Sequence, residues 1–183
     1  MKELSLNVLD ITMNSVKAKA TLINIYIDED DECLTMQIID NGCGMTAQIL
    51  QSVVDPFCTT RTTRKVGLGI PLLKLAAEQT GGKVTILSRH ELEFPDDHGT
   101  SVTATFYKQH IDFTPMGDII STVTTLIQGS PNIDFEFRHR SNSFDVTLDT
   151  RELREVLGPE IPLNDPEILQ WITQHLDEQY KNN

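Results

Sequence analysis

The chain has 183 residues, a length that suits one domain or one domain with a small appendage. Apolar residues make up 39% of the sequence, enough to build a core, which excludes an intrinsically disordered chain. The formal net charge of −12 disfavours nucleic acid as a partner, and the sequence lacks an apolar run long enough to cross a membrane.

The first 53 residues predict a helix followed by a strand hairpin. Residues 3–19 carry apolar side chains at helical spacing, which is typical of an amphipathic helix. Alternating isoleucines over 23–27 predict a strand, and the acidic run 28–32 predicts a turn. A returning strand over 34–38 would deliver Asp40 at its end.

Two helices and a loop are predicted next. Residues 46–53 predict a short helix with Thr46 as its cap. Residues 54–67 lack periodicity, which indicates a loop. Residues 68–80 predict a second amphipathic helix that the glycines 81–82 end.

The rest of the chain predicts further strands and helices. Alternation over 84–86 and 102–106 indicates two strands, and helical spacing over 116–127 indicates a helix. Alternating apolar residues over 133–149 form a hairpin pattern. A final helix is expected to open at the cap-then-proline pattern of 164–166.

Asp10 and Asn14 lie four residues apart on the first predicted helix, so their side chains share one face, about 6 Å apart along the axis. An asparagine oxygen is a suitable Mg²⁺ ligand, and an acid one turn earlier could accept a proton from a group that attacks a phosphate. The alternative is a pair of polar residues on a solvated helix face.

Asp40 begins a glycine-containing segment directly after a strand, with Gly42, Gly44 and Met45. An aspartate at a strand end can accept a hydrogen bond from the amino group of adenine, and glycines let the backbone approach a flat base. The alternative is an ordinary Asp-Gly turn.

A basic cluster with Arg61, Arg64 and Lys65 precedes Gly67-Leu68-Gly69, where a helix is predicted to begin. A helix N-terminus with glycine-freed amides is suited to bind an anion, and the cations would add to the attraction for phosphates. The segment lacks the Gly-Lys-Ser/Thr of a P-loop. The alternative is a charged, solvent-facing segment.

Four segments in order resemble the conserved boxes of the gyrase, chaperone, histidine-kinase and mismatch-repair (GHKL) ATPase superfamily. Residues 8–21 are similar to the mismatch-repair version of the first box, and 55–70 to the histidine-kinase version of the lid and its glycines. The segment beginning Asp40-Asn41-Gly42 resembles the second box, and His98-Gly99-Thr100 the closing box. The resemblance covers roughly residues 4–107.

The resemblance implies a role for each matching residue. Asp10 would be the catalytic acid or base, and Asn14 would hold Mg²⁺. Asp40 would recognise adenine, and Thr100 would support the water network beside the base. The remaining nucleotide-binding residues would line the base pocket, form the mobile lid or contact the phosphates: Gly42, Gly44, Met45, Thr59, Thr60, Arg61, Lys65, Gly67, Leu68 and Gly69.

Four departures from the family pattern bear on the catalytic rate more than on binding. Asp10 stands where hydrolysing members carry Glu and where histidine kinases carry Asn. Lys17 replaces an acidic residue common in the mismatch-repair version, and Val66 stands where kinases usually carry Thr. One lid glycine is also missing.

The implied fold is α+β: a two-layer α/β sandwich of the Bergerat type, with a mixed, mostly antiparallel sheet and helices on one face. Residues 1–108 would form the histidine-kinase-like ATP-binding domain, and 109–183 a small helix–hairpin–helix extension. Many relatives supply an extra strand before the first box, where this chain starts. We therefore expect the 133–149 hairpin to be a separate element packed beside the core.

The resemblance implies ATP and Mg²⁺ as cofactors and three alternative functions. The first is a stand-alone kinase that phosphorylates a partner protein, the second a slow ATPase or nucleotide-gated switch that controls a partner, and the third a non-catalytic ATP-binding module. Compact relatives occur near iron-dependent hydrogenase genes in anaerobes, which points to an anaerobic redox enzyme system as a partner. A homodimer is compatible with the resemblance.

The remaining cysteines and histidines predict no further chemistry. Three widely spaced cysteines fit neither a zinc site nor a disulfide framework, and with no visible signal peptide they indicate a cytoplasmic protein. Cys43 and Cys58 are expected near the nucleotide as inert thiols. His110, His139 and His175 are expected to be surface histidines.

Overall fold

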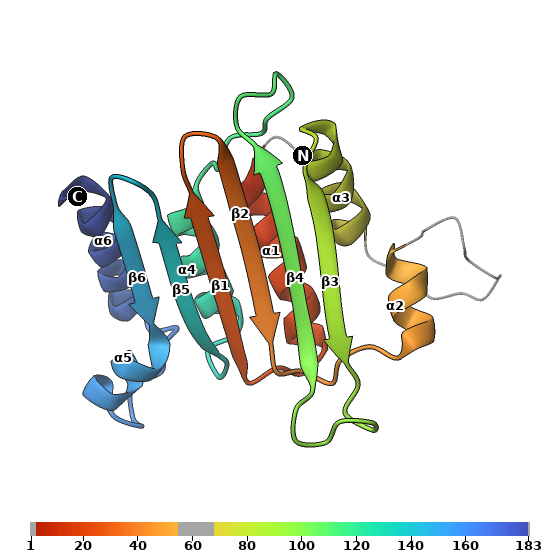
Figure 1. Cartoon of the computed structure of the whole chain (residues 1–183). Helices are drawn as coiled ribbons and strands as arrows, with labels where there is room; N and C mark the ends of the chain where they lie inside the picture. Colours follow the sequence, from red (N-terminus) through yellow and green to blue (C-terminus); the bar gives the residue numbers. More distant parts are fainter. Residues whose placement is uncertain (1–2, 55–67, 183) are drawn as a thin grey trace.

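The computed structural model describes residues 3–54 and 68–182, which form an α+β fold of two layers (Figure 1). In chain order the described elements are α1 (Leu4–Lys17), β1 (Leu22–Glu29), β2 (Cys33–Asp40), α2 (Ala47–Val54), α3 (Gly69–Gln79), β3 (Lys83–Arg89), β4 (Gly99–Tyr107), α4 (Ile119–Gly129), β5 (Asp134–Arg140), β6 (Asp145–Asp149), α5 (Thr150–Leu157) and α6 (Pro166–Asn182).

The strands form one six-stranded sheet in the order β3-β4-β2-β1-β5-β6. Four of the neighbouring pairs are antiparallel, and β1 and β5 are parallel, so the sheet is mixed and mostly antiparallel, as predicted. The parallel pair aligns Leu22 with Asp134 and Asp28 with Arg140. The helix α4 lies between β4 and β5 in the chain and makes the crossover that a parallel connection needs.

Alternation along the strands gives the sheet one apolar face and one polar face. The apolar side chains pack under the helices and are buried: Ile23, Ile25, Ile27, Leu34, Met36, Ile38, Val102, Ala104, Phe106, Phe135, Phe137, Val146 and Leu148. The residues between them, such as Tyr26, Gln37 and Glu136, are half-buried on the other face. The two-residue period predicted these strands because each turns one face to the core.

The helices α3, α1, α4 and α6 form the second layer on the apolar face (Figure 1). Contacts join α1 to α3 and α4, and α4 to α6. The short α2 lies beside α3 and β3, and Thr46 caps it as predicted, since its Oγ1 accepts a hydrogen bond from Ile49 N at 3.4 Å. Among the described residues, no helix has the length and apolarity that crossing a bilayer requires.

The expectation that the 133–149 hairpin is a separate element is wrong. Its first strand, β5, is hydrogen-bonded to β1 within the sheet. The physical reason is that β2 occupies only one edge of β1, and Phe135 and Phe137 continue the buried face of the sheet across the other edge. The division of the chain at residue 108 stays a prediction.

Two smaller expectations are also corrected. The helix α5 was not predicted, because it is short and Thr150 is the residue of this helix that is buried. The sequence feature that could have predicted α5 is Asp149 at the cap position, followed by Glu152 in the first turn of the helix. His139 is not a surface histidine: it is 3% exposed, because it continues the inward-facing row of Phe135 and Phe137 on β5.

Candidate functional site

The helix α1 carries the first two predicted site residues. Its buried face packs on the sheet through Leu4, Val8 and Ile11. Asp10 is exposed and Asn14 half-buried on an adjoining face, four residues apart as predicted. Neither side chain is needed for the core, so both are available to a ligand.

The beginning of α3 lies against Asp10. A Cβ atom added to Gly69, the first residue of α3, would lie 3.1 Å from the Cβ of Asp10. Only a residue without a side chain lets the two helices approach so closely here. No side chain caps the N-terminus of α3 within the described residues, so its amide groups remain available to an anion. The contact places the N-terminal end of α3, a candidate anion site, beside Asp10.

Asp40 ends β2 and is held in one orientation by two hydrogen bonds. Ser15 Oγ donates to Asp40 Oδ2 at 2.6 Å, and the backbone N–H of Gly42 donates to Oδ1 at 2.9 Å. The side chain is 8% exposed. A buried carboxylate with further lone pairs and a fixed direction is suited to accept a hydrogen bond from a ligand amino group.

The segment after Asp40 packs between the end of α1 and the β3–β4 connection. Cys43 N donates to Ala18 O at 2.9 Å, and His98 Nδ1 lies 2.6 Å from Gly42 O. Gly44 has a φ of 67°, and a Cβ atom there would lie 2.0 Å from the carbonyl oxygen of Arg89. A side chain at Gly44 is therefore excluded by sterics and by the backbone conformation.

Thr100 lies beside Asp40 on the neighbouring strand, because the β2–β4 register pairs the two residues. Ser88 on β3 connects them to Met45: its Oγ accepts from Met45 N at 2.8 Å and lies 2.9 Å from Thr100 Oγ1. Sequence reasoning missed Ser88, since no motif contains it. The only available signal was its place two residues after the predicted strand 84–86, which continues to Arg89 in the structure.

The structure thus places the described site residues in two connected groups. Asp40, Gly42, Gly44, Met45 and Thr100 lie at the ends of β2 and β4. Asp10 and Asn14 lie on α1, and Gly69 of α3 packs against Asp10, with the exposed Leu68 just before α3. Ser15, next to Asn14, links the groups through its bond to Asp40. The other predicted nucleotide-binding residues lie outside the described residues: Thr59, Thr60, Arg61, Lys65 and Gly67.

The donor set fits a magnesium ion that a nucleotide brings with it. Within residues 3–54 and 68–182, the side-chain amide of Asn14 makes no hydrogen bond, so its oxygen is available to a cation. The same part of the chain has no cluster of three or more His, Cys, Asp or Glu residues that could hold a metal. Mg²⁺ would therefore take most of its ligands from phosphate oxygens and water, as it does in many phosphate-binding sites.

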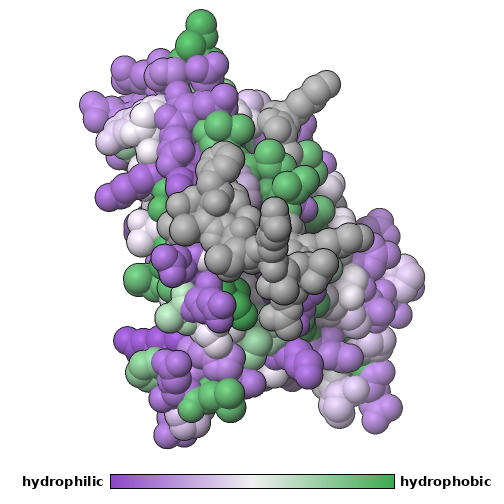
Figure 2. Space-filling model, turned by 90° about the vertical axis from the view of Figure 1, so that its right-hand side faces the viewer, coloured by the Kyte–Doolittle hydropathy of each residue, from purple (hydrophilic) through white to green (hydrophobic). Residues whose placement is uncertain are grey.

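Exposed leucines lie just before α3 and in the first two turns of its outer face. Leu68, Leu72 and Leu75 are exposed at helical spacing. Figure 2, which views the side of the molecule that carries α2 and α3, shows apolar side chains gathered beside polar ones on this face. An exposed apolar group of this kind is typical of a surface that contacts another protein.

Comparison with known proteins agrees with this geometry. A family model described as histidine kinase-, DNA gyrase B-, and HSP90-like ATPase matches residues 1–110. The sensor protein KdpD of Clostridium acetobutylicum is 29% identical over 94 residues, which are 49% of this chain and 10% of that protein. The chain therefore spans about a tenth of the length of this curated relative.

Two solved structures share the fold at 15% sequence identity. The ATPase domain of Aquifex aeolicus MutL, complexed with ADP, has a TM-score of 0.55 and is matched over 86% of this chain and 69% of its own. The N-terminal domain of a DNA repair protein has a TM-score of 0.54, over 87% of this chain and 58% of its own. Both structures are matched over a longer part of this chain than the family model, which covers residues 1–110. The structural likeness therefore extends into the C-terminal segment.

Proposed function

The chain belongs to the family of histidine kinase-, DNA gyrase B- and HSP90-like ATPases, and from this membership we propose that it binds Mg-ATP and phosphorylates a partner protein. The observation that carries the proposal is the contact of Gly69 with Asp10, one turn from Asn14. It brings an anion-binding helix end, a carboxylate and a metal-ligand candidate to one place.

In this proposal each residue has a separate task. Asp40 accepts a hydrogen bond from the adenine amino group, and the amides at the start of α3 receive phosphate oxygens. Bound Mg²⁺, held on the protein side by Asn14, would neutralise phosphate charge. Asp10 takes the proton from the hydroxyl or imidazole that attacks the γ-phosphate, and ADP leaves.

The acceptor in this proposal lies in another protein. The exposed leucines of α3 support this, because they begin where the phosphate-binding end of the helix begins and extend away from it. A partner that docks there would bring its acceptor group next to Asp10. A redox enzyme of an anaerobe is one candidate partner, and a second copy of this chain is another.

A second candidate function is a slow ATPase that acts as a switch. The observation that favours it is the exposure of Asp10, whose carboxylate can reach a water molecule as readily as an acceptor side chain. In that case the protein would hydrolyse ATP and alter a partner surface with the state of the nucleotide. A purely nucleotide-binding module is the third alternative.

The variant Asp10→Asn, with Asp40→Asn as its matched control, tests the proposal. Asp10→Asn should keep Mg-ATP affinity within about threefold and lower phosphoryl transfer by about 100-fold, because general-base catalysis is lost. Asp40→Asn should weaken ATP binding by about tenfold or more, because it loses a charge-assisted hydrogen bond. Calorimetry gives the affinities, and γ-labelled ATP with co-purified partner fractions gives the transfer.

Each contrary outcome points to a particular alternative. If the labelled γ-phosphate appears only as free phosphate, the kinase function is rejected in favour of the ATPase function. If the unmodified chain binds ATP but neither transfers nor hydrolyses it, the non-catalytic nucleotide-binding module is the remaining alternative. Unchanged affinity in Asp40→Asn would reject the ATP site itself.

A further inference from the structure

A groove of about 510 Å³ lies at the β6 edge of the sheet, where α5 and α6 flank the strand. This edge is opposite to the one formed by β3, and the candidate nucleotide site lies toward the β3 side (Figure 1). The residues that matter for the argument come from all three elements: Thr147 and Asp149 of β6, Glu152 and Val156 of α5, and Trp171 and His175 of α6.

Two large apolar side chains of the groove are exposed and one of them is held in place. Val156 is 85% exposed and Trp171 is 47% exposed. The indole of Trp171 stacks on the imidazole of His175, with ring centroids 4.7 Å apart and planes 9° apart. A tryptophan that is oriented before binding loses little entropy on contact with a partner, which is why such residues often dominate binding energy.

The edge of β6 is closed to the addition of another strand at its centre. Gln179 lies one turn after His175 on the same side of α6. Its side-chain amide donates to Thr147 O and accepts from Thr147 N, both at 2.9 Å. The backbone groups that a new strand would pair with here are occupied, so an occupant must enter the groove with its side chains.

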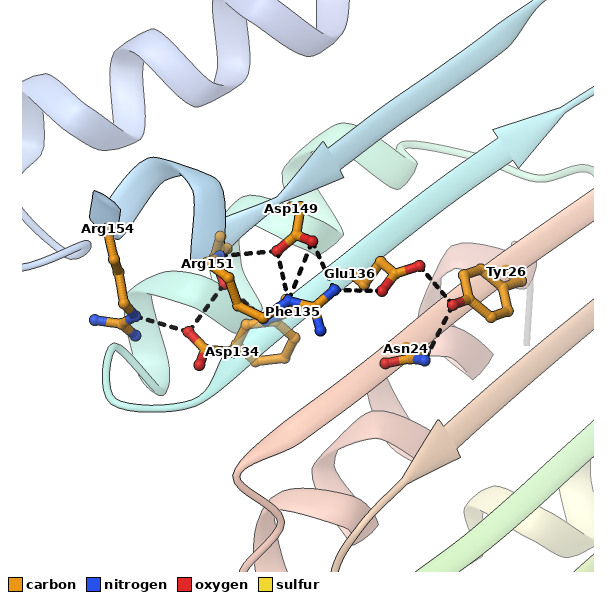
Figure 3. A network of polar contacts seen from close by, with 9 residues as sticks. Asn24, Tyr26, Asp134, Phe135, Glu136, Asp149, Arg151 and Arg154 are labelled. Atoms are coloured by element: carbon orange, nitrogen blue, oxygen red, sulfur yellow. Dashed lines mark hydrogen bonds and ion pairs between the residues drawn. The ribbon is translucent and has the colours of Figure 1, made fainter. Parts of the chain in front are cut away.

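The carboxylates on the sheet side of the groove already have hydrogen-bond and ion-pair partners. Arg151 donates to Glu136 Oε2 at 2.5 Å and to Asp149 Oδ2 at 2.6 Å, and Glu136 Oε1 accepts from Tyr26 OH at 2.6 Å. Figure 3 shows this network reaching from α5 across β5 to β1. These groups hold α5 against the sheet, and the single guanidinium balances one of the two carboxylate charges.

Unpaired carboxylates include Glu152 of the groove lining and three more on α5, on α6 and on the segment between them. The exposed side chains of Glu152, Glu155, Glu160 and Glu167 form no ion pair or hydrogen bond within the described part of the chain. Residues 109–183 contain 13 acidic and five basic residues, so they carry −8 of the net charge of −12. This field attracts a cationic segment and repels a nucleic acid backbone.

We propose that the groove between α5, α6 and β6 binds a positively charged segment of a protein partner, with an apolar side chain of that segment seated against Val156 and Trp171. The unpaired glutamates supply the charge complementarity, and the two apolar residues supply the anchor. The groove shares no residue with the candidate nucleotide site, so the two can be tested separately.

Trp171 is the single tryptophan of the chain, so its fluorescence reports on the groove directly. The probes are short synthetic peptides: one of lysine and leucine, one of lysine and serine, and one of glutamate and leucine. The lysine–leucine peptide should give a saturable change in emission and bind about tenfold or more tightly than the other two. Its affinity should fall as salt rises.

Two variants leave the reporter in place. Val156→Ser and the double variant Glu152→Gln with Glu155→Gln should each weaken the lysine–leucine peptide by about fivefold or more. Ile111→Ser is the matched control, because Ile111 is 96% exposed in the connection between β4 and α4, and it should change nothing. Mg-ATP affinity should stay the same in all three, which separates this proposal from the proposed function.

Several results would overturn the proposal. These are no saturable change with the lysine–leucine peptide, equal binding of the glutamate–leucine peptide, or equal effects of Ile111→Ser and Val156→Ser. A DNA oligonucleotide that by itself gives a saturable change in Trp171 emission would reject a protein segment as the occupant. A dimer in sedimentation that Val156→Ser dissociates would assign the groove to a second copy of the chain instead.

Discussion

At the scale of single residues, Gly69 has a role in packing that the sequence did not reveal. The pattern of Gly67-Leu68-Gly69 predicted contacts with phosphates. The structure places Gly69 against Asp10, and a Cβ atom added to Gly69 would lie 3.8 Å from Ile11 Cδ1. The distance between α1 and α3 therefore depends on the missing side chain, and so does the position of the candidate base relative to the phosphates.

We expect Gly69→Ala to shift α3 or Asp10 by a few tenths of an ångström, because the added Cβ would lie 3.1 Å from that of Asp10. Overpacking of this kind costs about 1–3 kcal/mol, and turnover of ATP should fall with it. Urea unfolding and an ATP turnover assay measure the two effects. Gly129→Ala in α4 is the control, since nothing lies within 4 Å of its added Cβ and alanine favours a helix. Equal stability of the two variants would contradict the packing role.

At the scale of elements, the C-terminal segment completes the sheet and the helical layer. The strand β5 pairs with β1 along seven residue pairs, and α4 packs on α1. Without them, one edge of β1 and one side of α1 would be exposed to water. Burial of β1 and α1 thus depends on residues more than 100 positions later in the chain, although the family model ends at residue 110.

A chain that ends at residue 108 should therefore fail to fold cooperatively. Circular dichroism and urea unfolding would detect the loss, and calorimetry would find no ATP binding. As a comparison, Phe137→Ala in the full chain removes one fully buried ring and should cost about 3–5 kcal/mol while the fold persists. Cooperative unfolding of the truncated chain with retained ATP affinity would instead show that residues 109–183 form a separate unit.

At the scale of the whole molecule, a polar cluster around the buried His139 joins distant segments at one end of the sheet. His139 Nδ1 lies 2.7 Å from Tyr180 OH of α6, and His139 Nε2 lies 3.3 Å from Glu29 Oε1 at the end of β1. Lys108, just after β4, donates to Glu29 Oε2 at 2.7 Å. Because Lys108 already balances Glu29, the imidazole need not be charged, and burial lowers the pKa of His139.

This cluster should make stability depend on pH. The unfolded chain takes up a proton at His139 near pH 6.5, while the lowered pKa keeps the folded imidazole neutral. The contribution of His139 is therefore complete above about pH 6.5 and is lost as pH falls below it, because the unfolded state then binds more protons. The urea concentration at the unfolding midpoint should decrease as the pH is lowered from 7.5 to 5.5. The variant His139→Gln should show a weaker dependence on pH. An identical slope in His139→Gln would exclude this histidine as the cause.

Local sequence patterns were sufficient to predict the strands, most helices and the family. Two-residue alternation showed which strand faces are buried, and the order of the boxes indicated the family that the family model matches. Such signals are local, since a few neighbouring residues are enough to read each of them. The positions of Asp10, Asn14 and Asp40 on their elements could be predicted for the same reason.

The tertiary structure alone decided which segments meet. Ser15 and Asp40 are 25 residues apart, and nothing in either segment specifies their hydrogen bond. The pairing of β5 with β1 and the burial of His139 also went unpredicted. An alternating strand can bury its apolar face beside any other such strand, so its partner is chosen by the packing of the whole core rather than by the strand itself.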